Sequence, residues 1–166
     1  TGKINKKQAL IFGVFLTVFS VSVLYYFANL LSAFLLLFTI VFYLFVYTIW
    51  LKRKTSQNIV IGGIAGSLPP VIGWAISTNS ISLASVSLFL IIFFWTPSHF
   101  WALSLYKADD YKKAKIPMMP ITDGTEKTKA YILIYSLLML PVVVLPYLIN
   151  FSGLIYLLPV LLLTFY

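Results

Sequence analysis

The sequence predicts an all-α protein, a polytopic bundle of transmembrane helices, and two observations carry this prediction. Hydrophobic residues make up 61% of the 166-residue chain and charged residues only 10%, whereas soluble globular domains average about 25% charged residues. The charges are also confined to three segments, 3–7, 52–54 and 107–129, and the stretches between them are uncharged. Because ionisable side chains are costly in hydrocarbon, we expect the uncharged stretches to lie in lipid.

Five uncharged stretches are long enough to cross a bilayer as helices, which takes about 20 residues each. A sixth stretch begins at Gly153 and is only about 14 residues long, too short to cross untilted. The predicted spans are 8–28, 30–51, 59–77, 81–106, 130–150 and the incomplete 153–166. No internal repeat or low-complexity linker divides the sequence, so we expect a single transmembrane domain (1–166) that is truncated at both ends.

The loops between these spans alternate in charge. Loops 1–7, 52–58 and 107–129 carry every charge, whereas the turns around Asn29, Asn79 and Ser152 carry none. The positive-inside rule therefore predicts that the charged loops lie on the cytoplasmic side of the membrane. We expect this membrane to be the inner membrane of a bacterial cell. The alternative is the matrix side of a mitochondrial inner membrane.

Composition also excludes several classes of function. The net charge of +8 is explained by membrane topology and by attraction to anionic lipid. Nucleic-acid binding is not expected, because the basic residues lie at helix ends rather than on a solvated face. The absence of cysteine and the single histidine exclude disulfides, thiolate metal sites and histidine-rich metal sites.

The span 59–77 contains small residues and prolines at membrane depth. Gly62 and Gly66 form a small-xxx-small pair that allows a neighbouring helix to approach closely, although ordinary packing would also explain them. Pro69 and Pro70 interrupt the backbone hydrogen bonds and predict a kink. A kink at this depth is expected to face protein or a ligand-filled cavity.

The span 81–106 places a lone histidine two turns from its charged end. If the helix continues through Asp110, then His99, Tyr106 and Asp110 share one helical face that runs from apolar depth to the membrane surface. A packing role is the alternative for His99.

Adjacent carboxylates follow this span at Asp109 and Asp110, and they lie among several lysines. Hard oxygen ligands beside cationic side chains suit Mg²⁺ bridged to a diphosphate. The alternative is that the two carboxylates cap a helix or offset the charge of the lysines. The neighbouring lysines are Lys107, Lys112, Lys113 and Lys115.

Four motifs resemble the heme O synthases (protoheme IX farnesyltransferases), which belong to the UbiA-type intramembrane prenyltransferases. The resemblance is close over about residues 48–120 and extends to the flanks only in the pattern of spans. The motifs are TIWLKRKTSQNIVIGGIAG from Thr48, PPVIGW from Pro69, WTPSHFWAL from Trp95 and DDYKKAKIPMMP from Asp109.

The resemblance implies nine transmembrane helices around a central cavity, with two Asp-rich loops at its mouth that bind Mg²⁺ and a prenyl diphosphate. Asp109 and Asp110 match the second loop, as metal ligands and catalytic groups. The first loop is expected just upstream of Thr1, so the six spans correspond to helices three to eight. This chain alone is therefore expected to be inactive.

The implied reaction transfers a farnesyl group from farnesyl diphosphate to a vinyl group of protoheme IX (heme B), giving heme O for terminal oxidases. The implied partners are both substrates and the bilayer, and contact with heme A synthase is left open. The expected diphosphate-binding residues are Lys52, Arg53, Lys107 and Lys112. The expected heme and cavity residues are Asn58, His99, Trp101 and Tyr106.

Four aromatic side chains are candidates for the lining of a dry cavity, in which a farnesyl cation would persist. An interfacial or lipid-facing position is the alternative for at least half of them. The four are Trp95, Phe100, Trp101 and Tyr106.

The sequence departs from the family pattern at two positions. Lys115 stands where the family usually has Gly, which alters the backbone freedom of the loop. Ser98 stands where Pro is common, which is expected to relax one kink. Two further classes of function stay open: a UbiA-type enzyme acting on a quinone precursor or a chlorophyllide, and a transporter, although a transporter is expected to place charge inside its spans.

Overall fold

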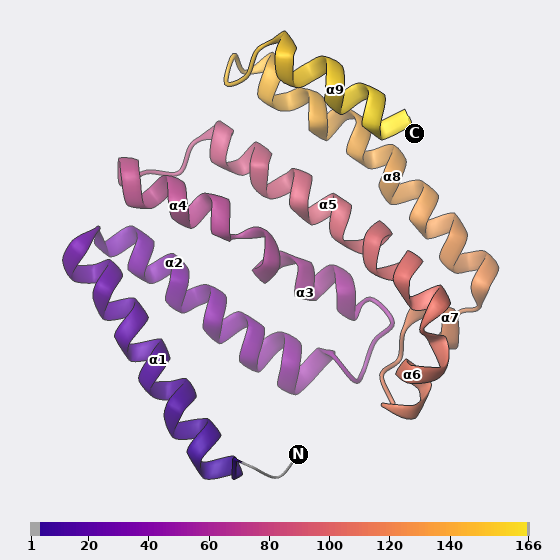
Figure 1. Ribbon diagram of the computed structural model, residues 1–166, viewed down its shortest axis with the longest axis horizontal. Coiled ribbons are helices and arrows are strands. Elements are labelled where there is room, and N and C mark those ends of the chain that lie inside the picture. The colour runs from indigo at the N-terminus through magenta and orange to yellow at the C-terminus, as the bar shows by residue number, and fades with distance from the viewer. Residues whose placement is uncertain (1–3, 166) are drawn as a thin grey trace.

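The computed structural model describes residues 4–165, and every regular element in that part of the chain is a helix (Figure 1). Five helical segments in it are long and apolar enough to cross a membrane, which confirms the predicted fold class. They are α1 (Lys6–Phe27), α2 (Leu30–Val41) with η1 (Phe42–Leu51), α3 (Asn58–Ser67) with α4 (Pro69–Thr78), α5 (Leu83–Tyr106), and α8 (Thr125–Leu148). Residues 1–3 of the first charged loop and Tyr166 of the last predicted span lie outside the described residues.

Three shorter helices complete the described chain. Two of them lie in the predicted loop 107–129, where the sequence analysis expected no helix of its own. The third corresponds to the incomplete sixth span. They are α6 (Ala108–Lys113), α7 (Met119–Thr122) and α9 (Leu154–Phe165).

Helix ends are set by polar side chains and by left-handed residues. Asn5 and Ser82 each form a capping box at the start of a long helix, which satisfies backbone N–H groups that have no partner in the first turn. At the opposite ends of α4 and α8, Asn79 and Asn150 adopt φ of 49° and 56°. Asparagine tolerates this conformation better than most residues, so both helices end where the sequence permits a sharp turn.

The predicted kink at the double proline is confirmed. Helix α3 ends at Ser67 and α4 begins at Pro69, because proline has no N–H to donate and its ring clashes with the preceding turn. The intervening Leu68 N–H bonds the carbonyl of Ala65 at 3.4 Å, three residues back instead of four. The third membrane-spanning segment is therefore two short helices joined by a break.

The second half of the α2 segment is a π-helix, which the sequence analysis did not predict. Within η1, the Thr48 hydroxyl donates to the Tyr43 carbonyl at 2.8 Å, five residues back. The Lys52 N–H then closes the helix on the Tyr47 carbonyl at 2.7 Å. π-helical turns are rare, and those that do occur are often found at functional sites. This one lies next to the cavity described below.

The close approach expected at Gly62 and Gly66 is only half correct. A Cβ on Gly62 would lie 2.7 Å from the Tyr47 ring of η1. A Cβ on Gly63 would lie 3.4 Å from Thr96 of α5, whereas one on Gly66 would meet nothing within 4 Å. The adjacent pair Gly62 and Gly63 therefore admits two different neighbours, and the predicted role of Gly66 in helix contact is wrong.

The packed core lies in the uncharged half of the bundle, where α5 contacts α4 and α4 contacts α2. Leu68, Val71 and Ala75 form this core together with Leu35, and Phe89 of α5 packs against it. At the same end, Asn29 Nδ2 donates to the Ala75 carbonyl at 2.6 Å and so ties the α1–α2 turn to α4.

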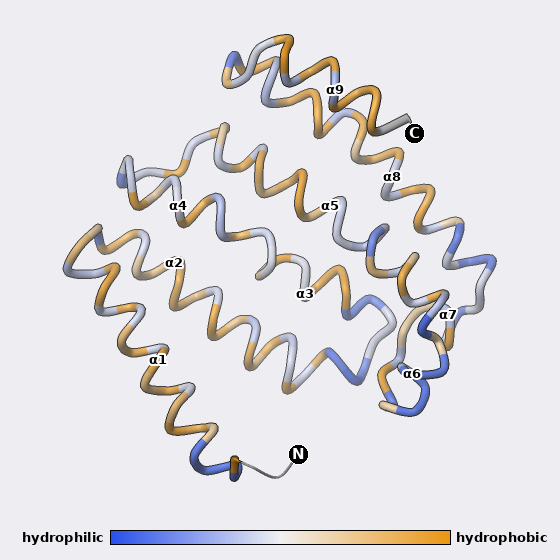
Figure 2. The backbone as a smooth tube through the Cα atoms, viewed as in Figure 1, coloured by the Kyte–Doolittle hydropathy of each residue, from blue (hydrophilic) through white to orange (hydrophobic). Residues whose placement is uncertain are grey.

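The charged segments gather at the other end of the bundle. Figure 2 shows strongly hydrophilic residues at the start of α1, in the turn after η1, through α6 and at the start of α8. Helices α1 and α2 meet at the uncharged end and diverge toward the charged end (Figure 1).

The condition for a face shared by His99, Tyr106 and Asp110 is not met, because α5 does not continue to Asp110. It ends at Tyr106, and Lys107 leaves the helical conformation with φ −108° and ψ 21° before α6 begins. The carboxylates of α6 are therefore set by a separate short helix.

Candidate functional site

A cavity of about 1130 Å³ lies in the half of the bundle nearer to the charged loops. It is lined by the charged-end portions of α1, η1, α3 and α5, and most of its lining side chains are apolar. Gly62, Gly63 and Gly66 of α3 line it, and so do Trp95 and Phe100 of the adjacent helix α5. These last two are the aromatic candidates that the structure places on the cavity.

The threonines that line the cavity turn their hydroxyl groups into their own helices. Thr17 donates to the Gly13 carbonyl at 2.9 Å, Thr39 to Leu35 at 2.7 Å and Thr96 to Ile92 at 2.6 Å. Their hydrogen-bonding capacity is thus largely used within the helices. The cavity consequently presents a mainly apolar surface, which suits a hydrocarbon ligand better than a hydrated one.

A cation marks the charged end of this cavity. Lys52 Nζ lies 5.6 Å from the centroid of the Tyr47 ring, a cation–π distance. Tyr47 itself lines the cavity, is buried, and packs against Gly62. Lys52 therefore joins the charged loop to the apolar lining, whereas Arg53 is exposed on the same loop.

The two carboxylates predicted as metal ligands are exposed in the first turn of α6. Lys107 occupies the N-cap position, and α6 has no side-chain capping hydrogen bond, so the capping alternative finds no support there. Lys107 Nζ lies 3.9 Å from Asp110 Oδ2, and both side chains are exposed. Lys112 is exposed at the end of the same helix.

Two adjacent carboxylates fit Mg²⁺, which proteins commonly hold through one or two carboxylates, with water and phosphate oxygens completing the coordination. Within residues 4–165, no group of three or more acidic, histidine or cysteine side chains is gathered to hold a metal. Asp109 and Asp110 could therefore hold the ion together with a phosphate ligand, but do not form a complete protein cage.

Lys115, the departure from the family glycine, has φ of 54°. It ends α6 in a Schellman turn, with its own N–H on the Lys112 carbonyl at 3.1 Å and the Ile116 N–H on the Tyr111 carbonyl at 3.0 Å. The left-handed region favours glycine, so the change from glycine to lysine at this position does bear on the backbone of the loop.

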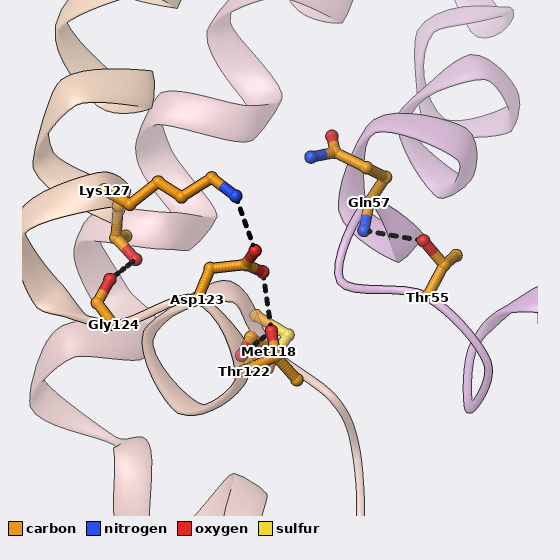
Figure 3. Close-up of polar contacts among 8 residues, drawn as sticks. Thr55, Gln57, Met118, Thr122, Asp123, Gly124 and Lys127 are labelled. Atoms are coloured by element: carbon orange, nitrogen blue, oxygen red, sulfur yellow. Dashed lines mark hydrogen bonds and ion pairs between the residues drawn. The ribbon is translucent and has the colours of Figure 1, made fainter.

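Asp123, to which the sequence analysis assigned no role, forms an ion pair just before the start of α8. Figure 3 shows the Asp123 carboxylate between Lys127 Nζ and the Thr122 hydroxyl, each at 2.8 Å. Hydrogen bonds from Lys127, Thr122 and Ser56 lower the pKa of Asp123 to about 2. The four-residue spacing from Asp123 to Lys127 was a visible signal for this ion pair, whereas the contact with Ser56 depends on the fold.

Asn58 lies outside the lining of the cavity, at the start of α3, and only 1% of it is exposed. Its Nδ2 donates to the Thr55 carbonyl at 2.8 Å and to the Pro117 carbonyl at 3.1 Å. Of the residues predicted to contact heme or the cavity, Asn58 is thus the one that connects two charged loops.

The other predicted heme residues occupy different environments. His99 is exposed and stacks on Trp95, with ring centroids 4.3 Å apart. Trp101 is fully buried between α5 and α8, with its ring edge-on to Tyr131 and Tyr135, which places it away from the cavity lining. Tyr106 is 88% exposed and is also absent from the lining.

The second departure from the family pattern, Ser98, makes contacts that proline could not make. Its hydroxyl donates to the Ile132 carbonyl of α8 at 3.1 Å and accepts a hydrogen bond from the Ser136 hydroxyl at 3.3 Å. A polar contact of this kind is a common device for joining helices in lipid. Ser98 therefore links α5 to α8.

Residues 1–166 match the sequence profile of the UbiA prenyltransferase family. The chain belongs to this family. The family assignment agrees with the separation of a charged end from an apolar cavity, and it confirms the resemblance drawn from the motifs.

Similar members of the UbiA prenyltransferase family are the protoheme IX farnesyltransferases of three bacteria. The chain is 73% identical to that of Pelagibacter ubique over 165 residues, 99% of this chain and 54% of the relative. It is 54% identical to that of Azorhizobium caulinodans over 93% of this chain and 50% of the relative. It is also 54% identical to that of Rickettsia rickettsii over 94% of this chain and 51% of the relative.

The chain thus spans about half the length of these relatives. No solved structure matches the chain.

Proposed function

We propose that this chain forms the central part of a protoheme IX farnesyltransferase. Such an enzyme would transfer the farnesyl group of farnesyl diphosphate to a vinyl group of heme B, giving heme O. The names of the similar proteins support this assignment. The observation that carries it is the apolar cavity beside Lys52, because the substrate has the same two parts, a long hydrocarbon and a diphosphate.

The cavity suits the hydrocarbon part of this substrate. Its threonine hydroxyls are bonded within their helices, so few polar groups compete for the farnesyl chain. A dry site also protects a developing farnesyl cation from water. The faces of Trp95, Phe100 and Tyr47 attract cations, and would stabilise positive charge along the chain.

The charged end suits the diphosphate. Lys52, Arg53, Lys107 and Lys112 would supply positive charge to the leaving diphosphate, which lowers the barrier to its departure. Asp109 and Asp110 would hold Mg²⁺ through their carboxylate oxygens. When bound, the ion shares the negative charge of the diphosphate.

His99 would face the porphyrin at the edge of the cavity. Its ring stacks on Trp95, which lines the cavity, and the residue is exposed. Trp101, the other predicted heme residue on α5, is buried between α5 and α8 and packs against Tyr131, so its role would be to hold α5 against α8.

The protein would act in the bacterial inner membrane with its charged loops on the cytoplasmic side. This orientation follows from the gathering of charge at one end of the bundle. It places the diphosphate site on the side where farnesyl diphosphate is dissolved. Delivery of heme O to heme A synthase would follow from this reaction.

The assignment is tested by removing charge from the two carboxylates in the full-length protein. Asp109→Asn and Asp110→Asn keep the side-chain size but lose the negative charge that Mg²⁺ needs. We expect each to lower farnesyl transfer by about 10²-fold or more, measured as heme O formation and pyrophosphate release. Glu126→Gln is the matched control, because this exposed acid pairs only with Lys129 among the described contacts, and its activity should stay near wild type.

Three outcomes would contradict the proposal. Wild-type turnover in both asparagine variants, at saturating and at limiting Mg²⁺, would leave Asp109 and Asp110 only the role of offsetting the charge of the neighbouring lysines. Prenylation of a quinone precursor but not of heme would indicate another UbiA-type enzyme. Substrate movement across the membrane without pyrophosphate release would indicate a transporter.

A further inference from the structure

The Asn58 side chain connects two loops that are far apart in the sequence. Its Nδ2 donates to Thr55 within its own loop at 2.8 Å and to Pro117 at 3.1 Å, across 59 positions of the chain. The first loop carries Lys52 and Arg53, and Pro117 follows the helix that carries Asp109 and Asp110. One buried amide thus joins the basic and the acidic parts of the charged end.

The chemistry of this contact requires a carboxamide. Both partners are carbonyl oxygens, so the side chain must offer two hydrogens at one nitrogen, which asparagine does. The same orientation leaves Asn58 Oδ1 buried without a hydrogen-bond partner among the described residues. An unpaired buried acceptor is unfavourable, and an apolar side chain would avoid it, so space filling alone does not explain asparagine here.

The contact reaches the carboxylates through a short and ordered path. Ile116, the residue before Pro117, donates to the Tyr111 carbonyl at 3.0 Å and so fixes the end of α6. On the other side of Pro117, Met118 and Met119 are 1% and 0% exposed. Pro117 therefore lies between a closed turn and a buried anchor, and a displacement of its carbonyl would be transmitted to α6.

A second contact supports the same junction between the loops. Ser56, two residues before Asn58, is near enough to the Asp123 carboxylate to help lower its pKa, and the carboxylate accepts a hydrogen bond from Lys127. Figure 3 shows loop 55–57 facing the Asp123 turn. The two charged loops consequently approach each other on either side of Met118 and Met119, and the Asn58 bond to Pro117 joins them.

We propose that Asn58 is a positioning residue that holds the α6 carboxylates at a fixed distance from the basic loop. A diphosphate must meet both groups at once, and a misplacement of about 1 Å can cost up to 10²-fold in rate. This inference rests on the proposed function and replaces the expected contact of Asn58 with heme.

The first arm of the test measures the distance between the loops. Spin labels on cysteines at exposed Lys54 and Lys113 of the full-length protein, made free of other cysteines, report that distance by pulsed electron resonance. We expect one narrow distribution in the parent protein and in Gln57→Ala, the matched control at the neighbouring amide. Asn58→Ala and Asn58→Asp, which lose both donated hydrogens, should give broad or displaced distributions.

The second arm measures substrate use. The Asn58 variants should raise KM for farnesyl diphosphate by about 10-fold or more, weaken binding of a non-reactive farnesyl diphosphate analogue in parallel, and leave KM for heme near that of the parent. A thermal melt of each variant identifies any general loss of fold, and the smaller Asn58→Asp change provides a second variant if Asn58→Ala is unstable.

Two results would overturn the inference. One is an unchanged loop distance in both Asn58 variants. The other is a rise in KM for heme with unchanged analogue binding, which would make Asn58 a porphyrin contact. A parent protein that binds the analogue but forms no heme O would contradict the proposed function instead, while the distance and analogue measurements would still decide the role of Asn58.

Discussion

At the scale of single residues, the backbone conformation of Lys115 explains what the change from the family glycine to lysine means. A lysine at φ 54° carries strain that glycine does not, and it ends the helix that bears both candidate metal ligands. The strain is tolerated because two backbone hydrogen bonds close the turn around it.

We predict that Lys115→Gly raises the stability of the protein by up to about 1 kcal/mol, measured as a higher midpoint of thermal unfolding in detergent. Lys115→Asn should stabilise in the same direction, since asparagine also tolerates this conformation. Lys113→Gly is the matched control and should destabilise by up to about 1 kcal/mol, because Lys113 is the last helical residue of α6. Equal effects of the two glycine substitutions would show that charge, not backbone conformation, governs this loop.

His99 is the second residue whose role can be isolated. Ring stacking is worth about 0.5–1.5 kcal/mol, so His99→Ala in the full-length protein should raise KM for heme by roughly 2- to 12-fold. Binding of farnesyl diphosphate should stay near wild type, and His99→Phe should restore much of the heme affinity because it keeps a flat ring on Trp95. Parallel loss of heme use, diphosphate binding and melting temperature would indicate a packing role.

At the scale of helices, substitutions at Gly62 and Gly66 distinguish the effect of packing between helices from the effect of helix propensity. A methyl group on Gly62 would meet the Tyr47 ring at 2.7 Å, whereas one on Gly66 would meet nothing within 4 Å. Tyr47 has little freedom to yield, because it is buried and its ring lies 5.1 Å from that of Tyr43.

Gly62→Ala should therefore destabilise the protein by about 1–3 kcal/mol through overpacking. Gly66→Ala should be neutral or stabilising by up to about 1 kcal/mol, since alanine favours the helix. Thermal unfolding of the two purified variants, compared side by side, decides the matter. A larger loss at Gly66 would restore the original expectation of a paired-glycine contact.

The elements also show what could be predicted from sequence and what could not. Charge segregation located the spans, because lipid penalises charge wherever the chain folds, and Pro69 located the break, because its effect is local. The end of α5 at Tyr106 carries no glycine or proline signal, so continuation to Asp110 was the simplest expectation. The π-helix 42–51 and the burial of Trp101 against Tyr131 depend on neighbouring helices, which no local pattern encodes.

The same distinction holds for the candidate site. Asp109, Asp110 and Lys52 were found from residue type and from the family motifs. The bond from Asn58 to Pro117 joins positions 59 residues apart, and only the folded chain brings them together. The division of the cavity lining among Trp95, Phe100 and three glycines was likewise set by helix orientation.

At the scale of the whole molecule, the charge distribution predicts orientation in the membrane. The chain contains no cysteine, so single cysteines introduced at Asn79 and Lys113 are unique within it. An impermeant thiol reagent should label Lys113→Cys only from the cytoplasmic side and Asn79→Cys only from the opposite side. Labelling of both positions from the same side would contradict the proposed topology.

The segment 58–78 is held by hydrogen bonds near both of its ends and is interrupted at its middle. Asn58 fixes its charged end to Pro117, and Asn29 fixes its other end through the Ala75 carbonyl. The interruption is the break before Pro69, which separates the half that walls the cavity from the half that builds the core. A change of angle at that break would alter the width of the cavity, because only the half before Pro69 lines it, and the contacts of the core half would not need to change.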